Sequence, residues 1–349
     1  MLSLVLAYCA AFGITVGTTA LLLPMLTRLG ARQTVSENAP ASHAGKQGTP
    51  TMGGLFILIG VLAPAAFWFM VTQPGMHRSA ERDYVAPTVL LTMLYFGAIG
   101  FIDDLLIVRR GRNLGLKARQ KFAMQCVGAV LFVVWLSATG RAGYTTWITV
   151  LPPAAHLPIG PLVINLGFWF FPLAAIYLVG MSNAANITDG LDGLLAGIAM
   201  IIALALAWQL SGSPEPALGV VAAFVAGSCG GFLWWNCHPA RLFMGDTGSL
   251  ALGGVLASLA LAGKQETGLA VASLVLWAEL ISVILQVGVF QWRKRRYGAQ
   301  YASDHRLLRR SPLHHHLEEL GCPETAVVQR LWLLAALCGS ASLLWRLAG

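Results

Sequence analysis

Long apolar segments recur along the whole sequence, and they constrain its fold more than any other feature. Most are close to the 20 residues that a helix needs to cross the hydrocarbon core of a bilayer. A transmembrane β-barrel would instead show alternating segments of about 10 residues. The sequence therefore predicts an all-α, polytopic membrane protein with about ten transmembrane helices and one domain, residues 1–349. The predicted spans, with ends good to about four residues, are 3–27, 53–73, 86–106, 120–140, 164–184, 191–211, 217–236, 248–263, 268–291 and 328–347.

The distribution of charge gives this chain an orientation in the membrane. Only 11% of its residues are charged, against about 25% in a typical soluble domain. When the loops alternate between the two sides, 18 of the 23 Lys and Arg residues fall on one side. The positive-inside rule places that side in the cytoplasm and both termini outside. Membrane orientation, rather than nucleic-acid binding, therefore explains the net charge of +8. The outer loop 141–163 predicts a short β-hairpin.

Acidic residues inside or beside the apolar spans are the strongest functional signal. Five of the seven aspartates lie there, all toward the predicted cytoplasmic side: Asp103, Asp104, Asp189, Asp192 and Asp246. A carboxylate at the centre of a membrane helix costs about 3 kcal/mol or more, so it needs a partner, water or a cation. Mg²⁺ prefers oxygen ligands and bridges to substrate phosphates. The aspartates therefore predict a metal-dependent active site.

Two further motifs carry these aspartates. In residues 183–193, Asn183, Asn186, Asp189 and Asp192 follow one another at intervals of three, so neighbouring pairs would share a face of a helical turn. The run Gly245-Asp246-Thr247-Gly248 predicts a carboxylate at the start of a helix, where anions and metal–phosphate complexes are favoured. The alternative is that Asp246 only caps the span that begins near residue 249.

Two polar segments contain no aspartate. The loop 43–54 has Lys46, Thr51 and several glycines, and such a loop exposes donors for a phosphate or another polar ligand; alternatively, Thr51 is a helix cap and Lys46 lies at the headgroups. His314, His315 and His316 are contiguous. Consecutive helical side chains point about 100° apart, so contact with phosphate oxygens or proton transfer suits these histidines better than one shared metal.

Taken together and in this order, the motifs resemble those of the phospho-N-acetylmuramoyl-pentapeptide transferase family, within the superfamily of polyprenyl-phosphate N-acetylhexosamine-1-phosphate transferases. The resemblance covers nearly the whole chain. It implies transfer of phospho-MurNAc-pentapeptide from UDP-MurNAc-pentapeptide to undecaprenyl phosphate. The two products are UMP and lipid I, which is an intermediate of peptidoglycan synthesis. It also implies a multi-pass protein of the bacterial inner membrane, a cytoplasmic Mg²⁺ site and, as in many members, a homodimer.

The resemblance also implies roles for individual residues. Asp246 matches the main Mg²⁺ ligand, Asp103 and Asp104 match the pair that faces the lipid phosphate, and His314 completes the catalytic set. Lys46, Asn236 and Phe243 match the uridine pocket. The full substrate-binding set implied by the resemblance is Lys46, Thr51, Arg119, Lys121, Asn183, Asn186, Asp189, Asp192, Asn236, Phe243, Gln286, His315 and His316.

The chain departs from the family pattern at three places. Ile107 stands where the family usually has Lys, Cys322 stands where Trp is common, and the segment 292–313 is longer than usual. If the usual lysine contacts phosphate, then Arg109, Arg119 or Lys121 must replace it.

Other functions remain open at the level of sequence. A sister enzyme that transfers GlcNAc-1-phosphate or a similar sugar phosphate would share most of these motifs. The transfer itself allows a direct displacement or a route through a covalent aspartyl intermediate. A secondary transporter or channel would place its aspartates near the bilayer midplane on broken helices of matching halves, and no such repeat is seen.

Overall fold

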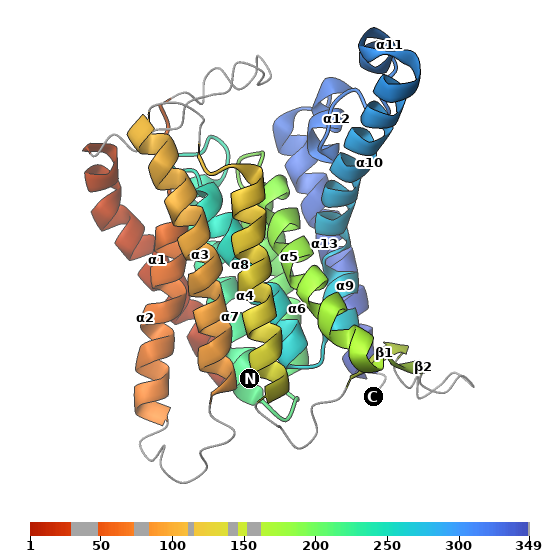
Figure 1. The fold of residues 1–349 in the computed structure, drawn as a ribbon. Coiled ribbons are helices and arrows are strands. Elements are labelled where there is room, and N and C mark those ends of the chain that lie inside the picture. Colours follow the sequence, from red (N-terminus) through yellow and green to blue (C-terminus); the bar gives the residue numbers. More distant parts are fainter. Residues whose placement is uncertain (29–47, 73–83, 111–114, 139–145, 152–161, 348–349) are drawn as a thin grey trace.

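The polypeptide forms an elongated bundle of helices (Figure 1). The computed structural model describes residues 1–28, 48–72, 84–110, 115–138, 146–151 and 162–347. The long helices are α1 (Leu2–Arg28), α2 (Gly54–Thr72), α3 (Val85–Arg110), α4 (Ala118–Ala138), α5 (Phe170–Thr188), α6 (Leu194–Leu210), α7 (Pro216–Asn236), α8 (Gly245–Ala262), α10 (Leu274–Tyr297) and α13 (Glu324–Leu347). The short elements are β1 (Trp147–Leu151), β2 (Leu162–Asn165), the 3₁₀ helix η2 (Gly167–Trp169), α9 (Glu266–Ala272), α11 (Ala299–Asp304) and α12 (Leu313–Glu319).

The predicted all-α membrane architecture is confirmed. Within the described residues, nine helices are long and apolar enough to cross a membrane, and α6 is a shorter apolar helix of 17 residues. Large apolar side chains on the outside of the bundle, such as Leu21, Phe67, Ile176 and Leu333, are exposed and suit contact with lipid tails. The predicted hairpin is also present, because β1 and β2 pair as antiparallel strands.

The ninth predicted span differs from the structure. Residues 268–291 were expected to form one helix, but the chain is divided between α9 and α10 at Ser273. The Ser273 hydroxyl donates a hydrogen bond of 2.6 Å to the Leu269 carbonyl, and such a local bond competes with regular helix continuation. Helix α10 also continues to Tyr297, because the apolar pattern marks membrane depth and not the end of a helix.

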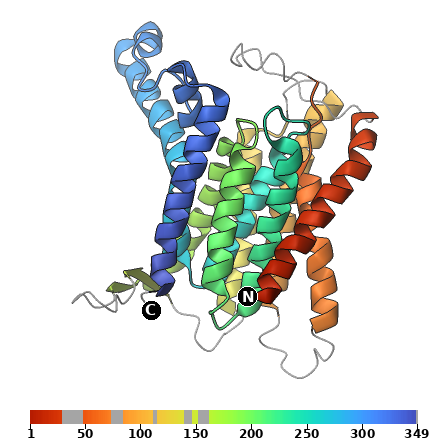
Figure 2. The ribbon, with the colours of Figure 1, turned by 180° about the vertical axis from the view of Figure 1, so that it is seen from behind.

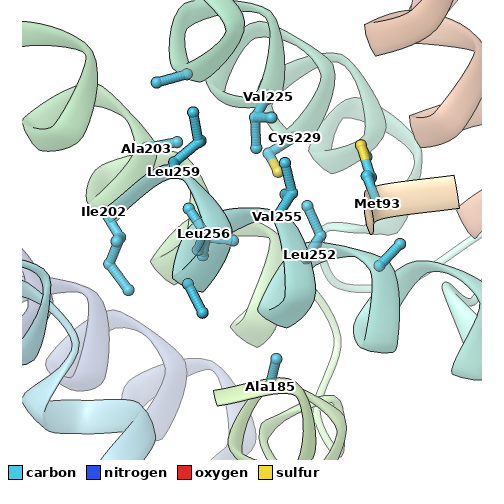
Figure 3. Packing of buried hydrophobic residues seen from close by; sticks show 14 of the residues in the cluster. Met93, Ala185, Ile202, Ala203, Val225, Cys229, Leu252, Val255, Leu256 and Leu259 are labelled. Atoms are coloured by element: carbon cyan, nitrogen blue, oxygen red, sulfur yellow. The ribbon is translucent and has the colours of Figure 1, made fainter. Parts of the chain in front are cut away.

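Helix α8 forms the centre of the bundle. Its side chains Leu252, Val255, Leu256 and Leu259 meet residues of α3, α5, α6 and α7, as Figure 3 shows. Glycines let two neighbouring helices approach its first turns closely. A Cβ on Gly100 of α3 would lie 2.1 Å from the Asp246 carbonyl oxygen, and one on Gly54 of α2 would lie 2.0 Å from the Gly248 nitrogen. Close backbone contact of this kind is typical of membrane helices.

One part of the fold projects from the bundle. We call residues 274–319, which form α10, α11 and α12, the arm. Helix α10 extends beyond the ends of its neighbours and carries α11 at its tip, while α12 lies back beside it (Figure 1). Figure 2 shows α13 running alongside the arm. The start of α1 and the end of α13 lie at the opposite end of the bundle from α11 (Figures 1 and 2).

Candidate active site

Four helices bring charged and polar side chains together where α3 and α5 approach their last turns and α4 and α8 begin. The Lys121 ammonium lies 3.0 Å from Asp103 Oδ2 and also forms a close ion pair with Asp246 Oδ2. The Asn186 amide donates a hydrogen bond of 2.8 Å to Asp246 Oδ1. We call this cluster of Asp103, Asp104, Asp246, Lys121 and Asn186 the aspartate centre. Residues as far apart in sequence as 103 and 246 therefore meet at one place.

Asp104 has a different set of contacts from its neighbour Asp103. Its Oδ1 accepts the Asp246 backbone N–H at 3.0 Å, and its Oδ2 accepts the Thr247 N–H at 2.9 Å and the Thr247 hydroxyl at 2.6 Å. These are free donors at the start of α8, and the helix dipole favours a negative charge there. Asp104, rather than Asp246, therefore caps α8, and the Asp246 carboxylate is left to face Lys121 and Asn186.

The carboxylate oxygens of the aspartate centre are suitable ligands for a hard divalent cation. Carboxylate oxygens of Asp103 and Asp246 lie around one ammonium group, with the Asn186 side chain beside them. Mg²⁺ takes oxygen ligands and is commonly held by one or two carboxylates plus substrate phosphates. The Lys121 ammonium shows that a positive charge is accommodated between the two carboxylates.

Residues 189–193 are not helical, so the expectation that Asp189 and Asp192 share a helical face is wrong. Helix α5 ends at Thr188, and Gly193 has a φ of +77° that favours glycine. Asp192 Oδ2 accepts the Ala240 N–H at 3.1 Å and lies 3.1 Å from His238 Nδ1. Asp192 therefore belongs to a second polar cluster, in which ligand atoms of Asp192, His238 and Glu324 lie within 4.8 Å of one another.

Asp189 lies at the end of α5 and is partly accessible. Desolvation by the surrounding atoms, followed by repulsion from Asp246, Asp104 and Asp192, raises the pKa of Asp189 to about 8. At neutral pH this carboxyl group is therefore mostly protonated, and it is able to donate a hydrogen bond.

The loop before α8 joins the start of α2 through backbone hydrogen bonds. Phe243 N–H donates to the Pro50 carbonyl, and Gly53 N–H donates to the Phe243 carbonyl, both at 2.8 Å. Thr51 is buried in this contact, and Phe243 is partly exposed. Lys46, a predicted uridine-pocket residue, lies outside the described residues.

Asn236 fastens the same loop to the 189–193 turn. Its Oδ1 accepts the Gly193 N–H at 3.0 Å, and its amide donates to the Leu242 carbonyl at 2.8 Å. Of the predicted uridine-pocket residues, Asn236 thus ends α7 and Phe243 lies in the loop that follows, beside the second polar cluster.

The three contiguous histidines have three different environments. His314 is fully buried, and its Nδ1 lies 3.1 Å from Glu279 Oε2 of α10. His315 Nδ1 lies 2.7 Å from Glu318 Oε2; burial lowers the pKa of His315, against the opposing effect of Glu318. His316 Nδ1 accepts the Arg309 N–H at 3.2 Å. The rings of His314 and His315 pack edge to face with their centroids 4.3 Å apart, while the three Nδ1 atoms have three different partners.

The remaining predicted residues are distributed around the site. Asn183 donates to Gln125 Oε1 at 2.8 Å. The Gln286 amide contacts the Leu308 backbone, accepting its N–H at 2.9 Å and donating to its carbonyl at 3.2 Å. Arg109 and Arg119 are exposed. Of the three cations considered as replacements for a lysine at Ile107, Lys121 is the one whose contacts reach the aspartates.

Sequence reasoning missed several residues of the site: Gln125, His238, Glu279 and Glu324. Two of them carried a usable signal. Glu279 is a charged residue within a predicted span, as the aspartates are. Gln125 follows Lys121 by four residues and therefore lies on the same face of α4. His238 and Glu324 lie in a loop and at a helix start, where the sequence showed no distinguishing pattern.

Comparison with known proteins gives the class of this membrane protein. Residues 86–264, which contain the aspartate centre, match glycosyl transferase family 4. Residues 46–58 match signature 1 of phospho-N-acetylmuramoyl-pentapeptide-transferase. The fold and the site therefore define a multi-pass membrane glycosyl transferase.

Curated relatives narrow the class. Proteins named phospho-N-acetylmuramoyl-pentapeptide-transferase from Synechococcus sp. (strain JA-3-3Ab), Gemmatimonas aurantiaca and Halalkalibacterium halodurans are 44%, 41% and 40% identical to this chain. The alignments cover 97%, 90% and 96% of this chain and 92%, 85% and 94% of those proteins, respectively. The chain belongs to the phospho-N-acetylmuramoyl-pentapeptide transferase family, which confirms the resemblance seen in its motifs.

Proposed function

We propose that this protein transfers phospho-MurNAc-pentapeptide from UDP-MurNAc-pentapeptide to undecaprenyl phosphate and releases UMP. The product, lipid I, is a lipid-linked intermediate of peptidoglycan synthesis. The observation that carries the proposal is the aspartate centre, where the carboxylates of Asp103 and Asp246 both pair with the Lys121 ammonium group. Near-full-length relatives with the matching name support the choice of sugar.

The same proposal includes the surroundings of the reaction. The site faces the cytoplasm of a bacterial inner membrane, both termini lie outside, and the protein is a homodimer in the bilayer. The charge distribution supports the orientation. The helix ends that carry the aspartate centre lie at the end of the bundle opposite the start of α1 (Figure 1). This placement agrees with a cytoplasmic site and an N-terminus outside.

Asp246 and Asp103 are the residues that would hold Mg²⁺. When bound, the cation would neutralise charge that develops on the departing UMP. Asp104 keeps Asp246 in place by fixing the first turn of α8. The Lys121 ammonium balances the negative charge of the two carboxylates. When the ammonium moves away from these carboxylates, it is placed to contact a phosphate oxygen.

The lipid phosphate attacks the β-phosphorus of the donor in a direct displacement. A phosphate monoester has a second pKa of about 6, so much of the acceptor is already dianionic at neutral pH. Asp103 therefore orients this nucleophile more than it deprotonates it. Asn186, Asp189, Asn236 and Phe243 surround the nucleotide, and His314 to His316 lie toward the sugar and diphosphate.

A measurement of UMP release tests the proposal. The purified protein, supplied with UDP-MurNAc-pentapeptide, undecaprenyl phosphate and Mg²⁺, should release UMP, and Asp246→Ala should not. Unlabelled UDP-GlcNAc should fail to compete with radiolabelled donor; efficient competition would favour the sister enzyme instead. A chiral-phosphate substrate should show inversion at phosphorus, and retention would contradict the direct displacement.

A further inference from the structure

A buried acidic residue outside the aspartate centre is paired with the histidine tract. Glu279, in the first half of α10, and His314, in the first turn of α12, each have 0% of their side chain exposed. Glu279 Oε2 lies 3.1 Å from His314 Nδ1, and its Oε1 accepts the His314 backbone N–H at 3.2 Å. The carboxylate thus holds both the ring and the backbone of one residue.

This contact fixes the chemical state of the imidazole ring. A carboxylate accepts hydrogen bonds, so Nδ1 of His314 must carry the proton that lies between them. Nε2 is then an acceptor in the neutral ring and a donor in the imidazolium. His315 and His316 are held differently, by Glu318 of their own helix and by the Arg309 backbone. His314 is thus tied to α10, a helix long and apolar enough to span the membrane.

The other ring nitrogen of His314 points toward the proposed donor site. Nε2 is buried and has no hydrogen-bond partner among the described residues. A Cβ added to Gly190 would lie 2.3 Å from this atom, so the ring rests directly against the turn between Asp189 and Asp192. A buried polar nitrogen that lacks a partner is costly, which indicates that a partner arrives during function.

We propose that Glu279 is a positioning residue for the transfer reaction and that it acts through His314. It sets the Nδ1-protonated state of the ring and directs Nε2 at the 189–192 turn. Nε2 receives its partner when the donor substrate occupies that turn. The inference rests on the proposed function, because it assigns a role within the same site.

A purely structural pair and a positioning pair differ in how their substitutions combine. If Glu279 acts through His314, then removing the carboxylate costs nothing further once His314 has been replaced. A carboxylate that only stabilises the fold would lower activity independently of His314, and the two losses would multiply. A double-mutant cycle therefore separates the two readings.

The cycle uses the full-length protein with UMP release as the readout. We expect Glu279→Gln to lower kcat about 10- to 100-fold, as the loss of an orienting partner commonly does, with a smaller change in the KM of the donor. His314→Gln should lower kcat at least as much, and the double variant should match His314→Gln alone. Unchanged kcat in Glu279→Gln, or multiplying losses in the double variant, would overturn the proposal.

Two further variants keep the test decisive if Glu279→Gln fails to fold. Gly190→Ala presses on Nε2 from the opposite side while Glu279 stays intact, and it should also lower kcat at least tenfold. Full activity of Gly190→Ala would count against the proposal. Glu266→Gln is the matched control: Glu266 is a nearly buried carboxylate of α9 that pairs with Lys264 away from the site, so this variant should keep kcat within about twofold.

The proposed function and this inference fail in different ways. A wild-type protein that releases no UMP from UDP-MurNAc-pentapeptide contradicts the function itself. An active wild-type protein with multiplying losses in the cycle contradicts only the role of Glu279.

Discussion

The aspartate centre and the arm are held in place by different means. The centre is built on α8, whose backbone is in close contact with Gly54 and Gly100 of two neighbouring helices. The arm projects from the bundle (Figure 1), and its histidine segment is tied to α10 by the polar pairs Glu279–His314 and Gln286–Leu308. Close packing therefore fixes the position of the carboxylates, whereas a few hydrogen bonds fix the position of the histidines.

This difference predicts how substitutions should behave in the two regions. In the aspartate centre, the replacement of a polar side chain should lower activity and leave the helices in place, unless that side chain also caps a helix end. In the arm, a single lost hydrogen bond should move a functional group without unfolding the bundle.

The largest effect is expected for Asp246. Asp246→Ala removes the carboxylate that faces Lys121 and Asn186, so kcat should fall at least about 1000-fold. The thermal unfolding temperature should change little, because this side chain does not cap α8. UMP release and a thermal unfolding curve on the same preparation provide the check. Residual activity above a few per cent would contradict a central role for this carboxylate.

Asp104 should combine both kinds of loss. Asp104→Ala removes three hydrogen bonds from the start of α8, which should destabilise the fold by about 2–3 kcal/mol and displace Asp246. Asp103→Asn, one residue earlier, should reduce activity at nearly unchanged stability. Equal unfolding temperatures for Asp104→Ala and the wild type would contradict the capping role.

The sequence predicted these two regions unequally. Apolar length and charge asymmetry were enough for the membrane helices, because burial in lipid imposes a strong compositional pattern. The aspartates stood out because charge is rare in such spans. The separate tasks of Asp103 and Asp104 did not follow from sequence, since they depend on which residue faces the end of α8.

The turn after α5 shows a second limit. The three-residue spacing suggested one helical face for Asn183 to Asp192, but Gly190 and Gly193 allow the chain to leave the helix after Thr188. A glycine in the sequence indicates that the helix can end there, but it does not predict the path that the chain takes afterwards. Similarly, the end of α10 was placed too early because its last turns are basic rather than apolar.

The turn after α5, which lies beside the aspartate centre, and the arm should also respond oppositely to pH. The pKa of Asp189 is raised from its unfolded value of about 3.9 to about 8, so the folded state holds a proton that the unfolded chain releases. Stability should therefore fall as pH rises between about 4 and 8, and Asp189→Asn should flatten this fall by at least about 2 °C in unfolding temperature. Unfolding curves across this range test it; an equally steep fall in the variant would contradict it.

In the arm the sign is reversed. The pKa of His315 is lowered by burial, so the unfolded chain binds the proton more readily near its normal pKa of about 6.5. Stability should fall as pH drops below that value. His315→Asn should lessen this acid-side loss. An unchanged acid-side slope would count against a partly buried, neutral His315.

The smallest effect is expected in the second polar cluster. Glu324→Gln keeps an acceptor for the Asp192 N–H and removes one charge beside His238, so the donor KM should change only about two- to threefold. Initial rates at varied UDP-MurNAc-pentapeptide concentration would show it. A tenfold or greater loss of kcat would place this cluster among the reacting groups and weaken the contrast with the aspartate centre.

The account depends most on the claim that Asp103 and Asp246 hold one divalent cation between them. Electron paramagnetic resonance of Mn²⁺ with the purified protein measures this directly, with Mg²⁺ as the competitor. One Mn²⁺ per chain should bind, Mg²⁺ should displace it, and Asp103→Asn or Asp246→Asn should each weaken binding at least about tenfold. Wild-type affinity in both variants would contradict a cation site at these two carboxylates.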